Sequence, residues 1–129
     1  MSKIISPAQL RFKDDGKYIT ALTDKKLTKT DISMLVKEAK GRNRIVDLSG
    51  RDLRGLDLSR LALGRANISN ADLSGANLSY ASLFNANLSH ADMSNANLSY
   101  ADFSYANLSH AKLMDSNMAN AVMLKTILP

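Results

Sequence analysis

Cysteine and tryptophan are absent from this sequence of 129 residues, and proline occurs only twice. The lack of cysteine excludes disulfides and thiolate metal sites, which suits a reducing compartment. No apolar run approaches the roughly 20 residues that span a bilayer. The N-terminal stretch MSKIISPAQL also lacks the apolar core of a signal peptide. These absences favour a cytoplasmic protein of one domain, with at most a small appendage.

Positive charge is missing from the middle of the chain. No lysine or arginine occurs between residues 66 and 111, where the only acidic residues are three aspartates. Residues 1–45 contain eleven Lys/Arg and five Asp/Glu, a net charge of +6, whereas residues 46–129 contain six and seven, a net charge of −1. The total charge of +5 therefore combines a basic first segment with a nearly neutral second one.

Catalytic motifs are missing as well. The sequence contains no Gly-rich phosphate loop, no nucleophile elbow and no pair of carboxylates set apart from its repeats. The two histidines, His90 and His110, lie inside the repeats, and the pattern supplies no third metal ligand beside them. We therefore predict no enzyme activity, no catalytic residues, no cofactor, no bound metal and no small-molecule substrate.

What the sequence does contain is a period of five residues. From Leu48 to Leu128, every fifth residue is apolar, without exception over seventeen positions. Two positions before these centres, alanine recurs without interruption from Ala66 to Ala111. A period of five matches neither an amphipathic helix nor a flat strand. If each quintet forms one side of a coil, however, the centre and the small residue both point inward, and a core grows by stacking the coils.

The quintets ADLSG, ANLSY, ANLSH and ADFSY resemble the repeats of the pentapeptide-repeat family, and the pattern covers about residues 46–128. The resemblance implies an all-β solenoid: a right-handed quadrilateral β-helix in which four quintets make one coil. Residues 46–129 would then form about four coils. The pattern departs from the family at both ends, with larger inward residues at Arg51, Leu56 and Leu61, and with Lys112, Val122 and Ile127 in place of Asp or Asn.

Residues 1–45 do not follow the period. The stretch LRFKDDGKYITAL carries an Asp-Asp-Gly turn signal between apolar residues, which indicates a possible hairpin. The stretch TKTDISMLVKEAKG predicts an amphipathic helix over about 31–40, capped by Thr30 or Asp31 and ended by Gly41. Because an open first coil exposes unpaired edges, we expect this segment to be a small α/β cap on the β-helix.

A second interpretation of this segment uses its positive charge. Its basic residues could instead bind phosphate groups, although a solvated helix face explains most of them equally well. Binding to nucleic acid or to a membrane is therefore not the expected role. The residues in question are Lys25, Lys26, Lys29, Lys37, Lys40, Arg42 and Arg44.

With four quintets per coil, residues twenty apart stack. Tyr80 and Tyr100 then share one corner, Tyr105 lies on the next corner, and Phe84 points outward beside them. Exposed aromatic side chains are typical of protein-binding surfaces, so these four residues are the candidate partner-binding site. Packing between coils is the alternative explanation for them.

The last coil carries apolar residues where the pattern predicts exposure to water: Met114, Val122, Leu124 and Ile127. An exposed apolar end needs a cover. Either residues 124–129 fold back over it, or a second copy packs end to end about a two-fold axis. We favour the homodimer and take the four residues as the candidate self-association site.

The sequence as a whole favours a non-enzymatic interaction or scaffold module that presents flat faces to a protein partner. The resemblance implies a bacterial protein, and some members of the family are effectors delivered into host cells. Other members bind DNA gyrase by imitating duplex DNA, which gives an alternative function. A DNA mimic needs a dense negative field, and residues 46–129 carry a net charge of only −1.

Overall fold

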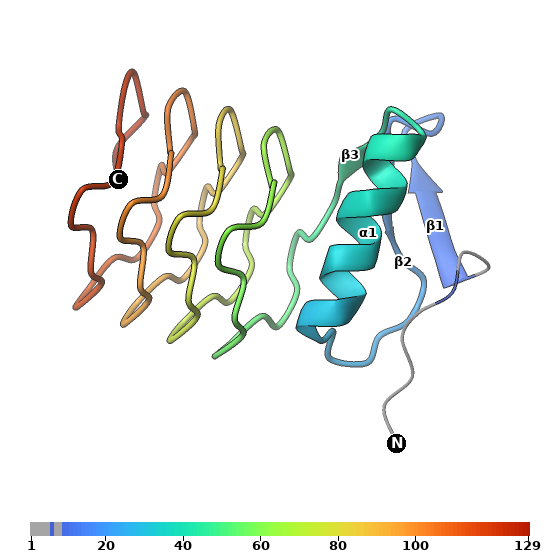
Figure 1. Ribbon diagram of the computed structural model, residues 1–129, viewed down its shortest axis with the longest axis horizontal. Coiled ribbons are helices and arrows are strands. Elements are labelled where there is room, and N and C mark those ends of the chain that lie inside the picture. Colours follow the sequence, from blue (N-terminus) through green and yellow to red (C-terminus); the bar gives the residue numbers. More distant parts are fainter. Residues whose placement is uncertain (1–5, 7–8) are drawn as a thin grey trace.

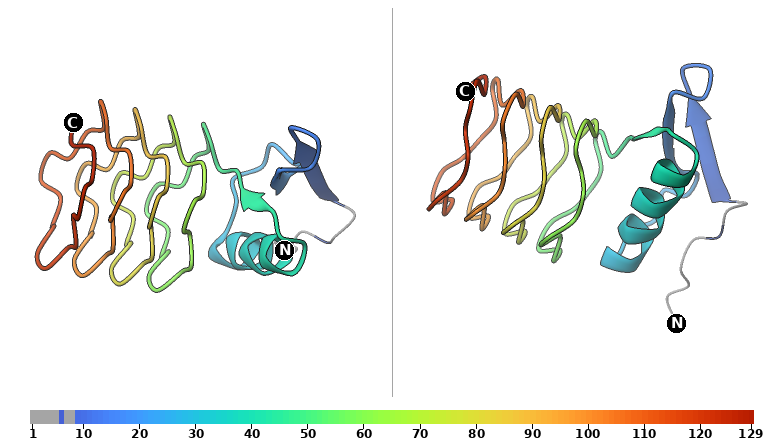
Figure 2. Two further views of the ribbon diagram at one scale, coloured as in Figure 1. Left: turned by 90° about the horizontal axis from the view of Figure 1, so that it is seen from above. Right: turned by 45° about the horizontal axis from the view of Figure 1, so that its top comes forward.

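The computed structural model describes residue 6 and residues 9–129, so most of the stretch in which we predict no signal core lies outside the described residues. An N-terminal segment of one helix and a small sheet is followed by a rod of stacked coils (Figure 1). The coils lie side by side along the rod, and the C-terminus lies at the end away from the helix (Figure 2). Among the described residues, no helix is long and apolar enough to cross a bilayer.

In the rod, each five-residue segment consists of a short extended stretch and a two-residue turn. Parallel bridges join residues twenty apart along its whole length, from Asp47 with Asn67 to Asn107 with Ile127. The backbone N–H of Leu48, for example, donates to the carbonyl oxygen of Asn67 at 2.7 Å. Four segments therefore complete one coil, and successive coils pair through their backbones like the strands of a parallel sheet.

The core of the rod contains the apolar centres and the alanines. Every centre from Leu48 to Leu108 is at most 1% exposed, and the alanines from Ala66 to Ala106 are equally buried. A fully buried leucine side chain contributes about 1.5–3 kcal/mol of transfer free energy. The alanines add little side-chain volume, which lets the leucines of the four sides meet in the middle of each coil.

Asp or Asn precedes most centres because its side chain closes the following turn. Its carboxylate or amide oxygen accepts a hydrogen bond from the backbone N–H two residues later, at 3.1 Å for Asn67 with Ser69 and 3.0 Å for Asp72 with Ser74. The two serine hydroxyls donate to the same oxygens, each at 2.7 Å. Asparagines twenty apart do form columns. Within the described residues, no hydrogen bond joins the side-chain amides of two asparagines in a column, so the columns are held by backbone pairing.

The N-terminal segment forms a three-stranded sheet with one helix beside it. Strands β1 (Leu10–Lys13) and β2 (Tyr18–Ala21) form an antiparallel hairpin, and β3 (Ile45–Val46) pairs with β2 in parallel. The hairpin turn uses positive backbone φ angles at Asp14, Asp15 and Gly16, as the Asp-Asp-Gly signal suggests. The helix is α1 (Lys29–Gly41), which lies between β2 and β3 in the sequence.

Helix α1 begins two residues earlier than the sequence pattern indicates. Its N-cap is Thr28, not Thr30 or Asp31. The Thr28 hydroxyl accepts a hydrogen bond from the backbone N–H of Asp31, and the Asp31 carboxylate accepts one from the backbone N–H of Thr28. This reciprocal pair is a capping box, which satisfies two donors that a bare helix start leaves unpaired.

Strand β3 runs directly into the first coil, and that coil adapts to the segment beside it. The guanidinium of Arg51 donates hydrogen bonds to the carbonyl oxygens of Ala21, at 2.5 Å, and Thr23, at 2.6 Å. Leu56 and Leu61 pack, partly buried, against the core. In the first coil, Arg51 therefore holds the end of β2, while Leu56 and Leu61 add apolar surface to the core.

Candidate protein-binding surface

The corners of the rod are turns whose second residue has a left-handed backbone conformation, with φ near +60°. Glycine and asparagine adopt this conformation most easily, and they occupy it at Gly75 and Asn85. The candidate residues Tyr80, Tyr100 and Tyr105 have φ angles of 60°, 61° and 61°. A larger side chain there costs about 1 kcal/mol or more, so all three tyrosines are held in strained turns.

Tyr80 and Tyr100 form a stack along one corner. Their ring centroids lie 4.7 Å apart, with 1° between the ring planes. The guanidinium of Arg60, one coil earlier on the same corner, lies 4.4 Å from the centroid of Tyr80. The two tyrosines remain 48% and 49% exposed. This corner therefore presents an accessible cation–π and aromatic ladder.

The next corner carries the other two candidate aromatic residues. Phe84 and Tyr105 meet edge to face, with centroids 5.5 Å apart and 60° between the planes. The ammonium group of Lys125 lies 5.9 Å from the centroid of Tyr105. Stacking by twenty residues could have identified Arg60 and Lys125 as neighbours of the candidate tyrosines, because Arg60 stands twenty residues before Tyr80 and Lys125 twenty residues after Tyr105.

One side of the rod lies between these two corners. Its outward column is formed by bridged residues with mostly short side chains: Ala62, Ser82, Asp102 and Val122. We call this side, together with Tyr80, Tyr100, Phe84 and Tyr105 on its borders, the aromatic face. It is a flat strip of backbone and short side chains between two rows of half-exposed rings. The structure thus brings all four candidate residues onto one side of the rod.

The histidines lie on a different corner. The rings of His90 and His110 stack with centroids 4.7 Å apart and 13° between the planes. In the described part of the chain, no three His, Asp or Glu side chains come together as metal ligands.

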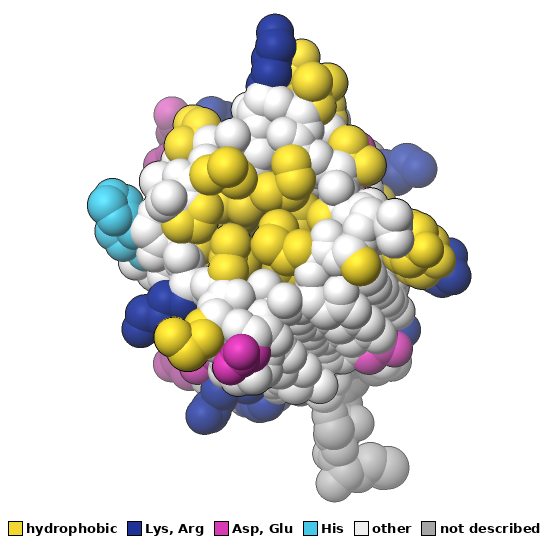
Figure 3. All heavy atoms as spheres, turned by 90° about the vertical axis from the view of Figure 1, so that its left-hand side faces the viewer, with side chains coloured by type: hydrophobic (Ala, Val, Ile, Leu, Met, Phe, Trp, Pro, Cys, Tyr) yellow, Lys and Arg dark blue, Asp and Glu magenta, His cyan; other side chains and the backbone are white. Residues whose placement is uncertain are grey.

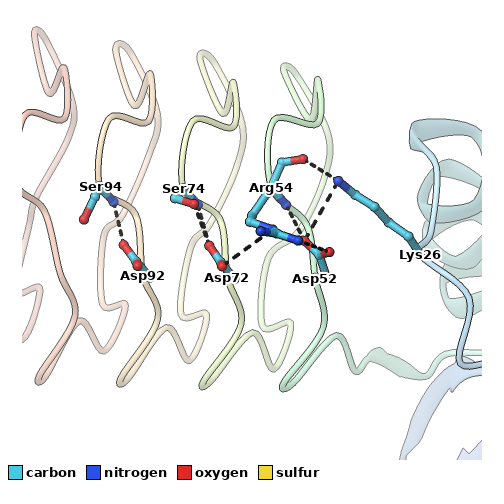
Figure 4. A network of polar contacts seen from close by, with 7 residues as sticks. All are labelled: Lys26, Asp52, Arg54, Asp72, Ser74, Asp92 and Ser94. Carbon is cyan, nitrogen blue, oxygen red and sulfur yellow. Dashed lines mark hydrogen bonds and ion pairs between the residues drawn. The ribbon is translucent and has the colours of Figure 1, made fainter.

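The acidic column of the rod is largely compensated by cations. Asp52, Asp72 and Asp92 follow one another and lead to Lys112. The guanidinium of Arg54 lies 2.9 Å from an Asp52 oxygen and 3.8 Å from an Asp72 oxygen, so it bridges two coils (Figure 4). Hydrogen bonds from Arg54 hold the pKa of the Asp52 carboxyl well below its usual range.

Basic residues of the N-terminal segment also pair with acids of the rod. Lys26 lies 3.9 Å from Asp52, and it donates a hydrogen bond to the carbonyl oxygen of Arg54 (Figure 4). Lys29 lies 3.1 Å from Asp57, whose pKa is lowered to about 2 by hydrogen bonds from Ser59 and Lys29. The surface where the N-terminal segment meets the rod therefore contains paired charges of opposite sign, and not an electrostatic field of one sign.

An open cleft of about 510 Å³ lies between the hairpin and the first coil. Its lining includes Arg11, Lys13, Asp47 and Arg51. Lys13 forms an ion pair with the buried Asp47, and Arg51 is bound to two backbone carbonyls. Among the described lining residues there is no histidine or cysteine to act as a base or nucleophile at neutral pH.

The sequence of the rod matches the model of the protein family described as "Pentapeptide repeats". The match contains eight copies of the repeat, over residues 46–79 and 81–120. These residues make up more than half of the chain. The chain belongs to the pentapeptide-repeat family. Proteins of this family are right-handed quadrilateral β-helices and are generally structural or interaction modules. The predicted family is confirmed, and the predicted fold is confirmed at the level of the β-helix.

Solved pentapeptide-repeat structures resemble this one. A protein from the thylakoid lumen of Arabidopsis thaliana is 39% identical, covering 69% of this chain and 62% of its own, with a TM-score of 0.63. Rfr23 of the cyanobacterium Cyanothece 51142 is 29% identical, covering 65% and 58%, with a TM-score of 0.64. This chain therefore spans less than two thirds of either protein.

QnrB1, a plasmid-mediated fluoroquinolone resistance protein, is 20% identical, covering 63% of this chain and 60% of its own, with a TM-score of 0.23. A similarity at that level carries no argument about a shared partner. The comparison with curated proteins gave no match.

Proposed function

We propose that this chain is a non-enzymatic protein-binding module whose aromatic face docks on a protein partner. The observation that carries the proposal is the placement of Tyr80, Tyr100 and Tyr105 in left-handed turns, where they remain about half exposed. Asparagine fills the same turn position elsewhere in the rod, as at Asn85 and Asn95, without that strain. Ring stacking between coils offsets part of the cost of the left-handed conformation. Such stacking alone does not explain why aromatic rings occur on both corners that border one side of the rod.

The chemistry of this face suits protein recognition. Tyrosine and arginine are enriched among the residues that dominate binding energy at protein interfaces. The flat strip between the corners gives a rigid platform, because its backbone is hydrogen-bonded to the coils on either side. A rigid platform loses little conformational entropy when a partner binds.

We further propose that residues 1–45 cap the first coil of a rod of about four coils. Arg51 bonded to the end of β2, and the ion pairs of Lys26 and Lys29 with the rod, support this role. A cytoplasmic location in a bacterium, or delivery into a host cell, stays a prediction.

The two alternative functions have weaker support. A DNA mimic must present unpaired negative charge, whereas Asp52 and Asp57 are paired with cations. A phosphate-binding patch needs free cations, whereas several basic residues of the N-terminal segment are already in ion pairs: Lys13, Lys25, Lys26, Lys29 and Arg42. Unchanged gyrase supercoiling at high molar excess, and no salt-sensitive nucleic-acid binding, are the expected results.

The experiment is affinity capture with the tyrosines replaced by the residue that the fold itself uses at this turn. A Tyr80→Asn, Tyr100→Asn, Tyr105→Asn variant removes the rings and keeps the turn conformation. The matched control is His90→Asn, His110→Asn, which makes the same change on another corner. We expect the tyrosine variant to lose the proteins recovered by the wild type and the histidine variant to keep them. Equal recovery with both variants would refute the aromatic face as the binding site.

A further inference from the structure

A groove of about 290 Å³ joins helix α1 to the aromatic face, at the end of the rod where α1 lies beside the coils (Figure 1). Ala62 and Ser82 of the strip line it, together with Gly64 on the corner next to them. The remaining lining residues come from the N-terminal segment and the start of the rod: Val36, Ala39, Lys40, Arg44 and Val46. Because the groove and the strip share Ala62 and Ser82, they form one continuous surface.

Small and apolar side chains form the floor of the groove. Val46 and Ala39 are buried, and Val36 packs against the core. Gly64 does not have a positive φ, and a Cβ added there would lie 3.5 Å from its nearest neighbour. Its turn would therefore accept a side chain, as it does with Ser104 at the same position two coils later. Glycine at such a place keeps the surface open for the close approach of another molecule.

Unpaired cations surround the groove. Lys40 and Arg44 line it, while Arg60 and Arg65 stand on the two corners that border the strip at this end. All four residues are exposed, and none takes part in an ion pair among the described residues. Among the residues of the aromatic face, only Asp102 is acidic. The groove therefore carries positive charge that ion pairs do not neutralise, and this charge attracts anionic groups.

Farther from α1 the same surface is mainly apolar. The four rings of the aromatic face follow the groove, and Val122 continues the strip beyond them. Leu124 stands forty residues after Phe84, on the same corner. Val122 and Leu124, which the sequence pattern assigned to self-association, therefore extend the apolar part of this surface. Lys125 adds one cation there, 5.9 Å from the ring centroid of Tyr105.

We propose that the partner docks with an extended peptide segment whose acidic residues lie in the groove and whose apolar residues lie along the aromatic face. This inference rests on the function proposed above, and it specifies the chemistry of the partner. Carboxylates complement the four cations, and the guanidinium groups of Arg60 and Arg65 can each bind one in bidentate geometry. Three coil spacings separate Ala62 from Val122, roughly 14 Å, which an extended peptide covers with about four residues.

A single-stranded nucleic acid is the competing ligand, because its bases could stack on the same rings. Its backbone carries a charge at every nucleotide, so the grooves that bind it have cations along their length. Here four cations stand at the groove and one, Lys125, stands near the other end. The apolar floor of the groove also suits peptide side chains better than phosphate groups. The arrangement favours a peptide, whose acidic residues can likewise be confined to one end.

Selection from a library of random peptides displayed on phage tests the inference, with the full chain as bait. We expect the selected peptides to carry a cluster of Asp and Glu residues next to a stretch with aromatic or aliphatic residues. A selection that enriches no peptide, or only peptides without acidic residues, would overturn the proposal.

The affinity of one selected peptide, labelled with fluorescein, is then measured by fluorescence anisotropy on matched variants. Lys40→Glu should weaken binding roughly tenfold, because it turns an attraction into a repulsion, and the loss should shrink at high salt. Lys112→Glu makes the same change in net charge on the opposite side of the rod, and it should leave the affinity within about twofold. Equal losses for the two variants would overturn the groove as the place where the acidic residues bind.

A second pair of variants changes the groove at one position. Ala62→Asp places a carboxylate in the groove and should weaken binding roughly tenfold, whereas Ala62→Ser should not. The same column of the rod contains Asp102 and Ser82, so both variants should keep the wild-type circular dichroism. Equal affinities of the Asp and Ser variants would contradict the proposal.

The tyrosine variant of the aromatic face separates this inference from the proposed function. It should also weaken peptide binding, whereas the histidine variant should not. Viewed along the rod, the histidines lie on the side opposite a corner with hydrophobic and basic side chains (Figure 3). If the tyrosine variant loses the captured proteins but the groove variants have no effect, only the acidic segment is refuted.

Two further outcomes would count against a peptide that spans groove and face. Peptide binding that the tyrosine variant leaves unchanged would refute the span and would remove support from the aromatic face. Displacement of the peptide by a single-stranded oligothymidylate of similar affinity would assign the surface to nucleic acid and overturn the proposal.

Discussion

Leu88→Ala and Leu128→Ala make the same change on the same side of the rod, and the structure predicts very different costs. Leu88 is fully buried between Ile68 and Leu108, which stand twenty residues before and after it. A Leu→Ala change at such a site costs about 3–4 kcal/mol, from lost transfer free energy and the cavity left behind. Leu128 is 60% exposed, so the same change there should cost about 1 kcal/mol or less.

The assay is urea unfolding followed by circular dichroism, at concentrations low enough to exclude self-association. The free energy of unfolding extrapolated to water should fall by the larger amount for Leu88→Ala, with an unchanged dependence on urea. A lower urea dependence would mean that coils unfold separately, as the nearest-neighbour contacts of a solenoid allow. If Leu128→Ala were as costly as Leu88→Ala, burial would not decide the cost of these changes, and the reasoning would be refuted.

Three further predictions concern single side chains. Tyr80→Asn should change the free energy of unfolding by less than about 1 kcal/mol in thermal melts, because relief of the left-handed strain offsets the lost ring stacking; a large loss would make the ring structural. Arg51→Met should cost about 2 kcal/mol and speed amide hydrogen exchange in β1 and β2, since two carbonyls lose a charged donor; unchanged exchange there would argue that Arg51 does not hold the end of β2. For Asp47, burial raises the pKa of the carboxyl, but hydrogen bonds from Lys13 and Ser49 outweigh it and the pKa is lowered. This stabilisation is present above about pH 4 and is lost as the pH falls through the lowered pKa, so Asp47→Asn should be less stable at neutral pH and approach the wild type on acidification; a difference independent of pH would contradict this assignment.

The repeat is the part of the fold that sequence reasoning reaches most directly. A period of five with an apolar centre and a preceding alanine indicates a solenoid, and the resemblance to pentapeptide repeats implies four sides per coil, from which the stacking by twenty residues follows. The columns of Tyr80 with Tyr100, and of His90 with His110, could therefore be placed from residue numbers alone. Asp or Asn recurs directly before the apolar centre because its side-chain oxygen accepts a hydrogen bond from the backbone N–H of the serine two residues later.

The features that the sequence analysis did not predict depend on contacts made by individual side chains. The start of α1 at Thr28 depends on a reciprocal hydrogen bond with Asp31, a signal present in the sequence as Thr followed three residues later by Asp. The hydrogen bonds from Arg51 to the carbonyl oxygens at the end of β2 have no such local signal, because the acceptors lie 28 and 30 residues away in the sequence. The bridge of Arg54 between Asp52 and Asp72 likewise depends on contacts between coils.

The sequence by itself indicated a solenoid, because neither a helix nor a flat strand can bury every fifth residue and its alanine together, and its resemblance to pentapeptide repeats implied the four-sided coil. It also determined which residues share a corner, since the backbone pairing repeats without change. Only the tertiary structure decided how the basic first segment meets the rod, because long side chains such as Lys26 and Arg51 reach across the junction to distant partners. It also decided how the rings meet, with Tyr80 and Tyr100 stacked in parallel and Phe84 against Tyr105 edge to face. The reach of a side chain and the orientation of a ring depend on what lies beside the residue in space, and the repeat pattern does not contain that information.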